Sequence, residues 1–129
     1  MSTRIAIDFD ETLVEGAPPR LKAGAVEALV AAKKAGHHLI LHSCRSTVTG
    51  HSPILEDEAT RFWQDGTVPS AVKFQWDLFD EMRTVLKAAN ALALFDEIWQ
   101  SPGKPLADMY VDDRAEFPDW GTFRRRFGI

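Results

Sequence analysis

Two pairs of aspartates stand out in this sequence, because each pair directly follows a short apolar run. Asp8 and Asp10 follow the run IAI, and Asp112 and Asp113 follow the run MYV. In an extended chain every second side chain points the same way, so Asp8 and Asp10 should face one spot. Two carboxylates so close together repel each other unless a cation lies between them. We therefore expect a divalent cation at these residues.

Magnesium is the cation that this donor set predicts, since Mg²⁺ prefers oxygen ligands in octahedral geometry and keeps several waters. A purely local alternative makes Asp8 and Asp10 turn residues and Asp112 the N-cap of a helix. Turns do not require paired acids at two separate strand ends, which favours the metal site.

The elements that must position these residues alternate along the chain. We expect strands at residues 5–7, 37–43 (HHLILHS), 95–101 (FDEIWQS) and 108–113 (DMYVDD). Helical spacing predicts helices within residues 25–36, 51–66, 77–92 and 118–129, and GAPPRLKAG (16–24) is expected to be a loop. Apolar strands separated by helices favour a parallel sheet covered on both faces. The predicted fold class is α/β, a three-layer α/β/α sandwich with a mainly parallel Rossmann-like sheet, in one domain over residues 1–129.

Capping residues and apolar spacing define the expected ends and inner faces of three helices. Gly36 and Gly66 should end the first and the second, and Ser52 and Pro53 should begin the second. The residues expected to face inward are, helix by helix, Val26, Leu29 and Val30; Leu55, Phe62 and Trp63; and Phe79, Met82, Leu86 and Ala89.

The carboxyl ends of the predicted strands gather the candidate site. In open parallel sheets ligands bind outside these ends. Both aspartate pairs fall there, and Ser43 ends the second predicted strand. We therefore expect one site built from residues that lie far apart in the sequence.

Composition bounds the possible partners. The 129 residues are 45% hydrophobic and 26% charged, with a net charge of −4, so no basic field favours nucleic acid or an anionic membrane. Arg124–Arg126 is expected to be a solvated helix face. The single cysteine, Cys44, fits a reducing cytoplasm, and neither a bilayer-spanning run nor a signal peptide is visible. We predict a cytoplasmic protein that binds neither membrane nor nucleic acid.

Four motifs in order resemble those of haloacid dehalogenase-type phosphatases. IAIDFDETL resembles the first motif, Asp-x-Asp-x-Thr after an apolar strand, and LILHS resembles the second, a strand ending in Ser or Thr. GKPLADMYVDD is similar to the third and fourth run together, a lysine followed by a strand and an Asp-Asp pair. The resemblance covers roughly residues 4–113, and the ending that follows is similar to that of very small bacterial members.

The resemblance implies a Mg²⁺-dependent phosphatase that passes through an aspartyl phosphate. Asp8 would be the nucleophile, and Asp10 would protonate the leaving alcohol and then activate water. Mg²⁺ would be held by the Asp8 carboxylate, the Asp10 main-chain carbonyl and Asp112. Ser43 and Lys104 would bind the phosphoryl oxygens. Two supporting roles are also implied: Asp113 would assist the metal or orient Lys104, and Thr12 would fix the loop after the nucleophile.

The sequence departs from the family pattern at three places. Residue 11 is Glu where Gly is common. Lys104 lies only eight residues before Asp112, so Lys87 and Lys73 are alternatives for its role. The usual cap domain is missing, and residues 66–94 would form at most a partial lid. An open site suits a small phosphorylated metabolite, with a homo-oligomer as a possible cover, although a macromolecular phosphate also fits.

Several other residues near the motifs have weaker functional interpretations. Arg45, beside Ser43, is predicted to clamp a second anionic group of the substrate, with a structural arginine as the alternative. Cys44 lacks the arginine six residues later that a cysteine phosphatase needs, since residue 50 is Gly. The four histidines lack zinc-ligand spacing, and the four tryptophans are expected in the core. A phosphotransferase or nucleotidase using the same site, or a non-catalytic protein that binds a phosphorylated ligand, remains the alternative function.

Overall fold

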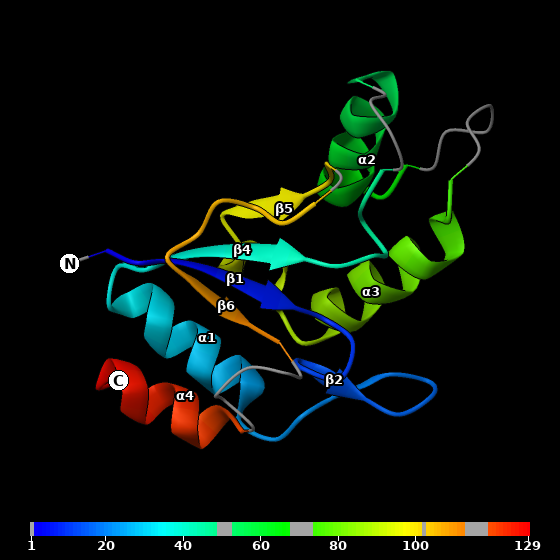
Figure 1. Ribbon diagram of the computed structural model, residues 1–129. Coiled ribbons are helices and arrows are strands. Elements are labelled where there is room, and N and C mark those ends of the chain that lie inside the picture. The colour runs from blue at the N-terminus through cyan, green and yellow to red at the C-terminus, as the bar shows by residue number, and fades with distance from the viewer. Residues whose placement is uncertain (1, 49–52, 68–73, 102, 113–118) are drawn as a thin grey trace.

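Four parallel strands form the main sheet: β1 (Arg4–Asp8), β4 (His38–His42), β5 (Glu97–Trp99) and β6 (Met109–Val111). The computed structural model describes residues 2–48, 53–67, 74–101, 103–112 and 119–129. The strand order is β5-β4-β1-β6, and helices flank the sheet (Figure 1). The α/β fold class and the parallel sheet are therefore confirmed.

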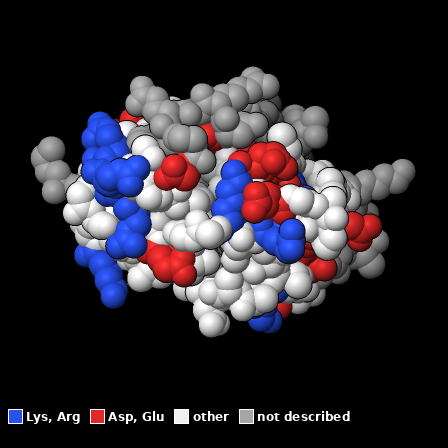
Figure 2. Space-filling model, turned by 90° about the horizontal axis from the view of Figure 1, so that it is seen from below, with Lys and Arg blue, Asp and Glu red and all other residues white. Residues whose placement is uncertain are grey.

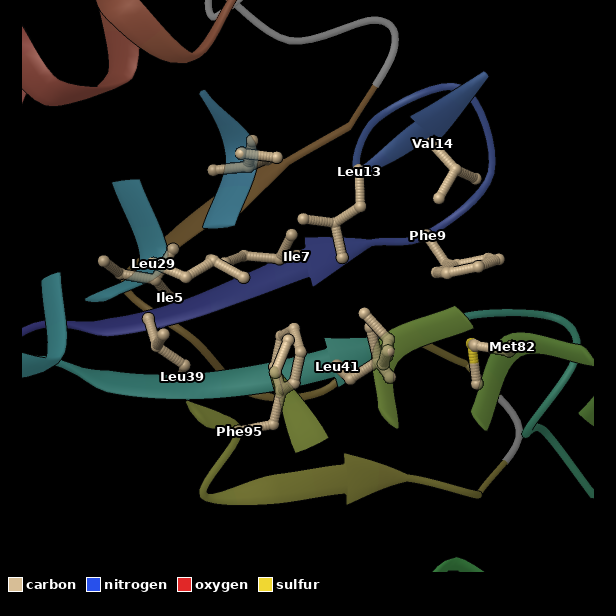
Figure 3. Close-up of a cluster of buried hydrophobic side chains, with 14 of the residues drawn as sticks. Ile5, Ile7, Phe9, Leu13, Val14, Leu29, Leu39, Leu41, Met82 and Phe95 are labelled. Carbon is tan, nitrogen blue, oxygen red and sulfur yellow. The ribbon is translucent and has the colours of Figure 1, made fainter. Parts of the chain in front are cut away.

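The two faces of this sheet differ in chemistry, because residues paired in register point the same way. Ile5 pairs with Leu39 and Met109, and Ile7 pairs with Leu41 and Val111, so one face is apolar. The opposite face carries Arg4 and His38 at one end and Asp8 and His42 at the carboxyl end. Figure 3 shows the apolar side chains of β1 and β4 in one cluster with Leu29, Met82 and Phe95. The polar residues therefore lie on the face that the main core does not use.

The helices are α1 (Ala25–Lys34), α2 (Pro53–Asp65), α3 (Trp76–Ala88), a 3₁₀ turn η1 (Leu92–Leu94) and α4 (Trp120–Phe127). Gly36 and Gly66, with φ of +87° and +82°, follow α1 and α2 in the left-handed conformation that glycine favours. Phe62, Phe79 and Met82 are buried, as expected. The expected N-cap, Ser52, lies outside the described residues.

The predicted inner face of α1 is only partly confirmed. The buried residues of α1 are Ala25, Ala28, Leu29 and Ala32, whereas Val26 and Val30 are only half-buried. Small alanine side chains allow the helix backbone to approach the sheet closely. The larger valines therefore lie at the edge of the contact; hydrophobicity alone does not report closeness of packing.

The expected loop over residues 16–24 contains part of a small antiparallel hairpin. Strands β2 (Val14–Glu15) and β3 (Arg20–Leu21) pair as Val14 with Leu21 and Glu15 with Arg20. The Ala17–Pro18 peptide bond in the connecting turn is cis. Two-residue strands carry too little periodicity to be recognised in a sequence. The hairpin adds an arm directly after the Asp8–Asp10 segment (Figure 1).

The chain between β5 and β6 lies against the polar face of the sheet. The Arg4 Nε donates to the carbonyl of Leu106 over 3.2 Å, and the Tyr110 hydroxyl donates to the carbonyl of Pro105 over 2.5 Å. At the amino end of the sheet, Glu97 bonds Arg4 and His38 at 3.1 and 2.8 Å. The two bonds to the carbonyls of Pro105 and Leu106 fix this part of the chain beside β1 and β6.

Basic side chains gather at one side of the surface formed by α1 and α4 (Figure 2). The last turn of α1 carries Lys33 and Lys34, and the last turn of α4 carries Arg124–Arg126, which is exposed as predicted. Cations at a helix C-terminus interact favourably with the helix dipole, and this local effect explains why the basic residues lie in the last turns of the two helices. Among the described helices, none has the length and apolarity that a membrane span requires.

Candidate active site

Three strand ends and one loop meet in a cavity of about 370 Å³ at the carboxyl edge of the sheet. Asp8 ends β1 and lies in register with His42, which ends β4, while Ser43 and Asp112 directly follow β4 and β6. The residues that line the cavity are Ala6, Asp8, His42, Ser43, Cys44, Lys104, Tyr110, Val111 and Asp112. Four of the predicted site residues, Asp8, Ser43, Lys104 and Asp112, are thus brought together.

The position of Asp8 is set by the tight turn that follows it. The Phe9 amide donates to Asp8 Oδ1 over 2.9 Å, and the Phe9 carbonyl accepts from the amides of Thr12, Leu13 and Val14. Trp120 Nε1 donates to the Thr12 carbonyl over 3.1 Å, and Thr12 is buried. The turn after Asp8 is therefore anchored to α4 through the Thr12 main chain. Among the described residues the buried Thr12 hydroxyl has no hydrogen-bond partner, so the role of its side chain stays a prediction.

Ser43 begins a turn whose backbone is held from several sides. Its carbonyl accepts from the hydroxyls of Ser46 and Thr47 at 3.2 and 2.8 Å, and its own Oγ accepts from the Arg45 amide at 3.1 Å. Gln75 Nε2 donates to the carbonyls of Cys44 and Thr47, at 2.8 and 3.2 Å. Ser43 itself is buried, and its hydroxyl donates no hydrogen bond among the described residues, so its proton can serve another acceptor.

Lys104 reaches the cavity from the loop before β6. Its Nζ lies 5.2 Å from the centroid of the Tyr110 ring, a distance suited to a cation–π interaction. This placement puts a cation in the same cavity lining as Asp8 and Asp112. Of the two alternative lysines, Lys87 lies in the last turn of α3 and does not line the cavity, and Lys73 lies outside the described residues.

Asp10 does not join Asp8 in this cavity, which corrects the expectation that the two carboxylates face one spot. Both of its oxygens accept hydrogen bonds from Arg45, from Nε and Nη2 at 2.9 Å each. Arg45 also donates to Glu81 Oε1 at 2.8 Å and to the Leu78 carbonyl at 3.0 Å. A bidentate bond to a guanidinium satisfies a carboxylate without a metal ion.

Arg45 is consequently a well-fixed residue rather than an open anion clamp. Its side chain is 12% exposed, and its guanidinium lies 5.2 Å from the centroid of the Phe9 ring. The hydrogen bond with Asp10 and then that with Glu81 raise the pKa of Arg45, although partial burial opposes them. These contacts favour the structural alternative for Arg45, and a contact with substrate stays a prediction.

The cavity carries the hard oxygen donors that Mg²⁺ prefers. Asp8 and Asp112 supply one carboxylate each to its lining. Asp10 is not among the residues that line the cavity, so its main-chain carbonyl stays a predicted ligand. No group of three or more Cys, His, Asp or Glu side chains converges within the described part of the chain. Mg²⁺ often binds one or two carboxylates and keeps several waters, so the donor set fits this ion. Asp113 lies outside the described residues.

Sequence reasoning missed His42, which it considered only as a zinc ligand. His42 lines the cavity beside Lys104 and Asp112. Burial, and then the charge of Lys104, lower the pKa of His42, while Asp112 acts in the opposite direction. Strand alternation in HLILH was the available signal, because it separates His38, Ile40 and His42 from the apolar face.

Comparison with known proteins supports the fold. The structure is similar to that of a conserved protein from Bacteroides thetaiotaomicron, with 25% sequence identity and a TM-score of 0.52. The similarity covers 99% of this chain and 91% of that protein. No protein-family model matches the sequence, and no curated protein matches it either.

Proposed function

We propose that this protein is a Mg²⁺-dependent phosphomonoesterase of the haloacid dehalogenase type, with Asp8 as the nucleophile. One observation carries the proposal: Asp8, Ser43, Lys104 and Asp112 line a single cavity although they come from four separate parts of the chain. A nucleophilic carboxylate, a hydroxyl donor and a cation within one cavity form a set suited to a phosphoryl group.

The first half of the reaction transfers the phosphoryl group to the protein. Ser43 donates a hydrogen bond to a phosphoryl oxygen, and Lys104 neutralises part of the phosphoryl charge. One Asp8 oxygen forms a bond to phosphorus while the bond from phosphorus to the alcohol oxygen breaks. The product is an aspartyl phosphate on Asp8, an instance of covalent catalysis by a carboxylate.

Asp10 handles the proton in both halves of the reaction. In its acid form it gives a proton to the departing alcohol oxygen. It then takes a proton from the water that attacks phosphorus and releases inorganic phosphate from Asp8. Because the Asp10 carboxylate is bound by Arg45 in this structure, these steps require it to turn toward the cavity. Glu81 and the Leu78 carbonyl keep Arg45 in place when Asp10 turns.

The carboxylates of Asp8 and Asp112, with the Asp10 main-chain carbonyl, would hold Mg²⁺. When bound, this ion supplies positive charge that reduces repulsion between the Asp8 carboxylate and the phosphoryl oxygens. The substrate in this proposal is a small phosphorylated metabolite, and the free thiol of Cys44 is consistent with the cytoplasm as the proposed location.

The test of the function is the mass of the intact protein after mixing with Mg²⁺ and an aryl phosphate. Asp10→Asn keeps the nucleophile but loses the base for hydrolysis, so it should accumulate one phosphoryl group, mapped to Asp8. Asp8→Asn should gain none, because it lacks the attacking oxygen.

The Asp8→Asn and Asp10→Asn variants are matched in charge. Both variants remove one negative charge near the cavity, so a purely electrostatic role would make them equivalent. A phosphoryl adduct on Asp8→Asn would place the nucleophile elsewhere. An unmodified Asp10→Asn together with an inactive wild type would favour a non-catalytic phosphate-binding protein.

A further inference from the structure

A second cavity, of about 410 Å³, adjoins the first and shares one wall with it. His42, Cys44 and Lys104 line both cavities. The remaining residues that line the second cavity are Thr47, Gln75 and Gly103. If the phosphoryl group occupies the first cavity, the leaving group of the substrate must extend in some direction, and this cavity is the adjacent space.

The second cavity is nearly uncharged, and its lining combines a mostly apolar surface with a few hydrogen-bonding groups. Lys104 is its one residue with a fixed charge among the described residues, and the phosphoryl group already uses that charge in the proposed reaction. Neither Phe, Trp nor Tyr is among the described residues that line it. Within the described part of the chain, a second anionic group would therefore find no further cation there, and a nucleobase would find no aromatic side chain on which to stack.

The donors and acceptors of this lining are held in place. The Thr47 hydroxyl donates to the Ser43 carbonyl, and oxygen lone pairs of that hydroxyl remain to accept from a ligand. The amide nitrogen of Gln75 is bound to the carbonyls of the 44–47 turn, which fixes the side chain at the cavity wall. The imidazole of His42 adds a nitrogen donor or acceptor. A Cβ placed on Gly103 would meet nothing within 4 Å, so the cavity is open there.

We propose that this second cavity is the leaving-group subsite, that it takes an uncharged polyhydroxylated group such as a polyol or sugar, and that His42 is a specificity-determining residue in it. The proposal rests on the function proposed above, because it takes the first cavity as the phosphoryl site. Fixed hydrogen-bonding groups without a spare charge favour hydroxyl groups over carboxylates, second phosphates and aromatic rings.

The first experiment compares kcat/KM for glycerol 3-phosphate, 3-phosphoglycerate and phenyl phosphate. The first two differ by a carboxylate in place of a hydroxymethyl group, so the pair isolates the effect of a second charge. Glycerol 3-phosphate should be preferred over 3-phosphoglycerate by roughly tenfold or more, since an unpaired charge costs at least as much as one hydrogen bond. Equal use of both, or preference for 3-phosphoglycerate, would overturn the proposal.

The second experiment uses His42→Leu and, as a matched control, His38→Gln at the other end of the same strand. His42→Leu should lower the ratio of kcat/KM for glycerol 3-phosphate to that for phenyl phosphate by roughly tenfold, the size of one net hydrogen bond. His42→Gln should restore much of the ratio, and His38→Gln should leave it unchanged. A ratio unaffected by His42→Leu would remove His42 from the subsite.

Binding measurements on Asp8→Asn test the subsite separately from the proposed function, because they need no turnover. Calorimetry would compare inorganic phosphate with glycerol 3-phosphate, in Asp8→Asn and in Asp8→Asn combined with His42→Leu. Tighter binding of the ester, lost on adding His42→Leu, supports the subsite even if the wild type hydrolyses nothing. Ester binding no tighter than that of phosphate contradicts it, whatever the outcome for phosphoenzyme formation.

Discussion

Arg45 and Asp10 form a bidentate ion pair, with two hydrogen bonds of 2.9 Å between the guanidinium and the carboxylate. The pair joins the segment after β1 to the segment after β4, and through Glu81 it joins both to α3. Planar, bidentate geometry of this kind is specific to arginine. In this structure Arg45 holds the residue proposed as the general acid and base, so its first effect on catalysis should come through Asp10.

Arg45→Met should lower kcat by roughly tenfold or more, because the segment that carries Asp10 loses its link to the segment after β4 and to α3. It should also lower the free energy of unfolding by about 1.5–3 kcal/mol, the range for hydrogen bonds to charged groups. Steady-state kinetics with an aryl phosphate and urea denaturation measure the two effects. Glu81→Gln, which keeps the Asp10 pair, is the control and should have the smaller effect on kcat. If Arg45 instead binds a second substrate anion, Arg45→Met would raise KM and leave kcat and stability unchanged.

Lys104→Ala should reduce turnover by about a hundredfold, the scale observed when one preorganised transition-state donor is removed. The reason is the position of Lys104 in the same cavity as Asp8. Lys87→Ala, in the last turn of α3, is the matched control and should behave as the wild type. If the two variants exchange these results, the lysine of the third motif has been assigned wrongly.

Asp112→Asn should raise the Mg²⁺ concentration needed for half-maximal activity by about ten- to a hundredfold, because one carboxylate ligand is lost. Activity titrated with Mg²⁺ after treatment with EDTA measures this change, and circular dichroism checks that the variant is folded. Asp108→Asn, which removes a carboxylate near the opposite end of β6, should leave the Mg²⁺ dependence as in the wild type. An unchanged Mg²⁺ requirement in Asp112→Asn would contradict its role as a ligand.

His42 should titrate below 6.5 in the metal-free protein, because burial and the charge of Lys104 lower its pKa. Lys104→Met removes the neighbouring cation and should raise the pKa of His42, whereas Asp112→Asn removes the anion and should lower it further. The imidazole proton resonances in a pH titration by NMR report both shifts. A pKa of His42 that does not respond to Lys104→Met would mean that the ammonium group lies elsewhere in solution.

Asp96→Asn should destabilise the protein at neutral pH by about 1.5–3 kcal/mol, the range for hydrogen bonds to charged groups. Partial burial is the largest single influence and raises the pKa of Asp96, but hydrogen bonds from Lys33 Nζ (2.6 Å) and the Leu39 amide (2.8 Å) together with nearby charges outweigh it. The net pKa is lowered.

A lowered pKa in the folded state means that this stabilisation is complete above the unfolded pKa of about 3.9 and is lost as the pH falls through the folded value. Urea denaturation from neutral to acidic pH should therefore show the difference between the wild type and Asp96→Asn shrinking at low pH. Asp57→Asn, on the exposed surface of α2, is the control. A difference that stays constant down to acidic pH would show that the carboxylate charge is not what stabilises the fold.

The sequence by itself determined the four main strands and the four helices, although most predicted segments run one to four residues beyond the observed ends. Four apolar runs became the four parallel strands, and Gly36 and Gly66 ended their helices, because both signals act between neighbouring residues. The meeting of Asp8, Ser43 and Asp112 could also be predicted, since the carboxyl ends of parallel strands lie at one edge of a sheet. The buried alanine face of α1 could not be predicted, because hydrophobicity does not report how closely a helix packs. The β2–β3 hairpin could not be predicted either, because two-residue strands have too little periodicity.

Only the tertiary structure decided the directions of the polar side chains. Asp10 and Arg45 are 35 residues apart, and nothing in the spacing of Asp8 and Asp10 reveals that a guanidinium satisfies one carboxylate and turns it out of the cavity. His42 belongs to the site because the register of β1 and β4 places it beside Asp8 on the polar face. A side chain's local pattern limits where it can point, but the partners that satisfy its charge and hydrogen bonds come from distant segments, and they exist only after the chain has folded.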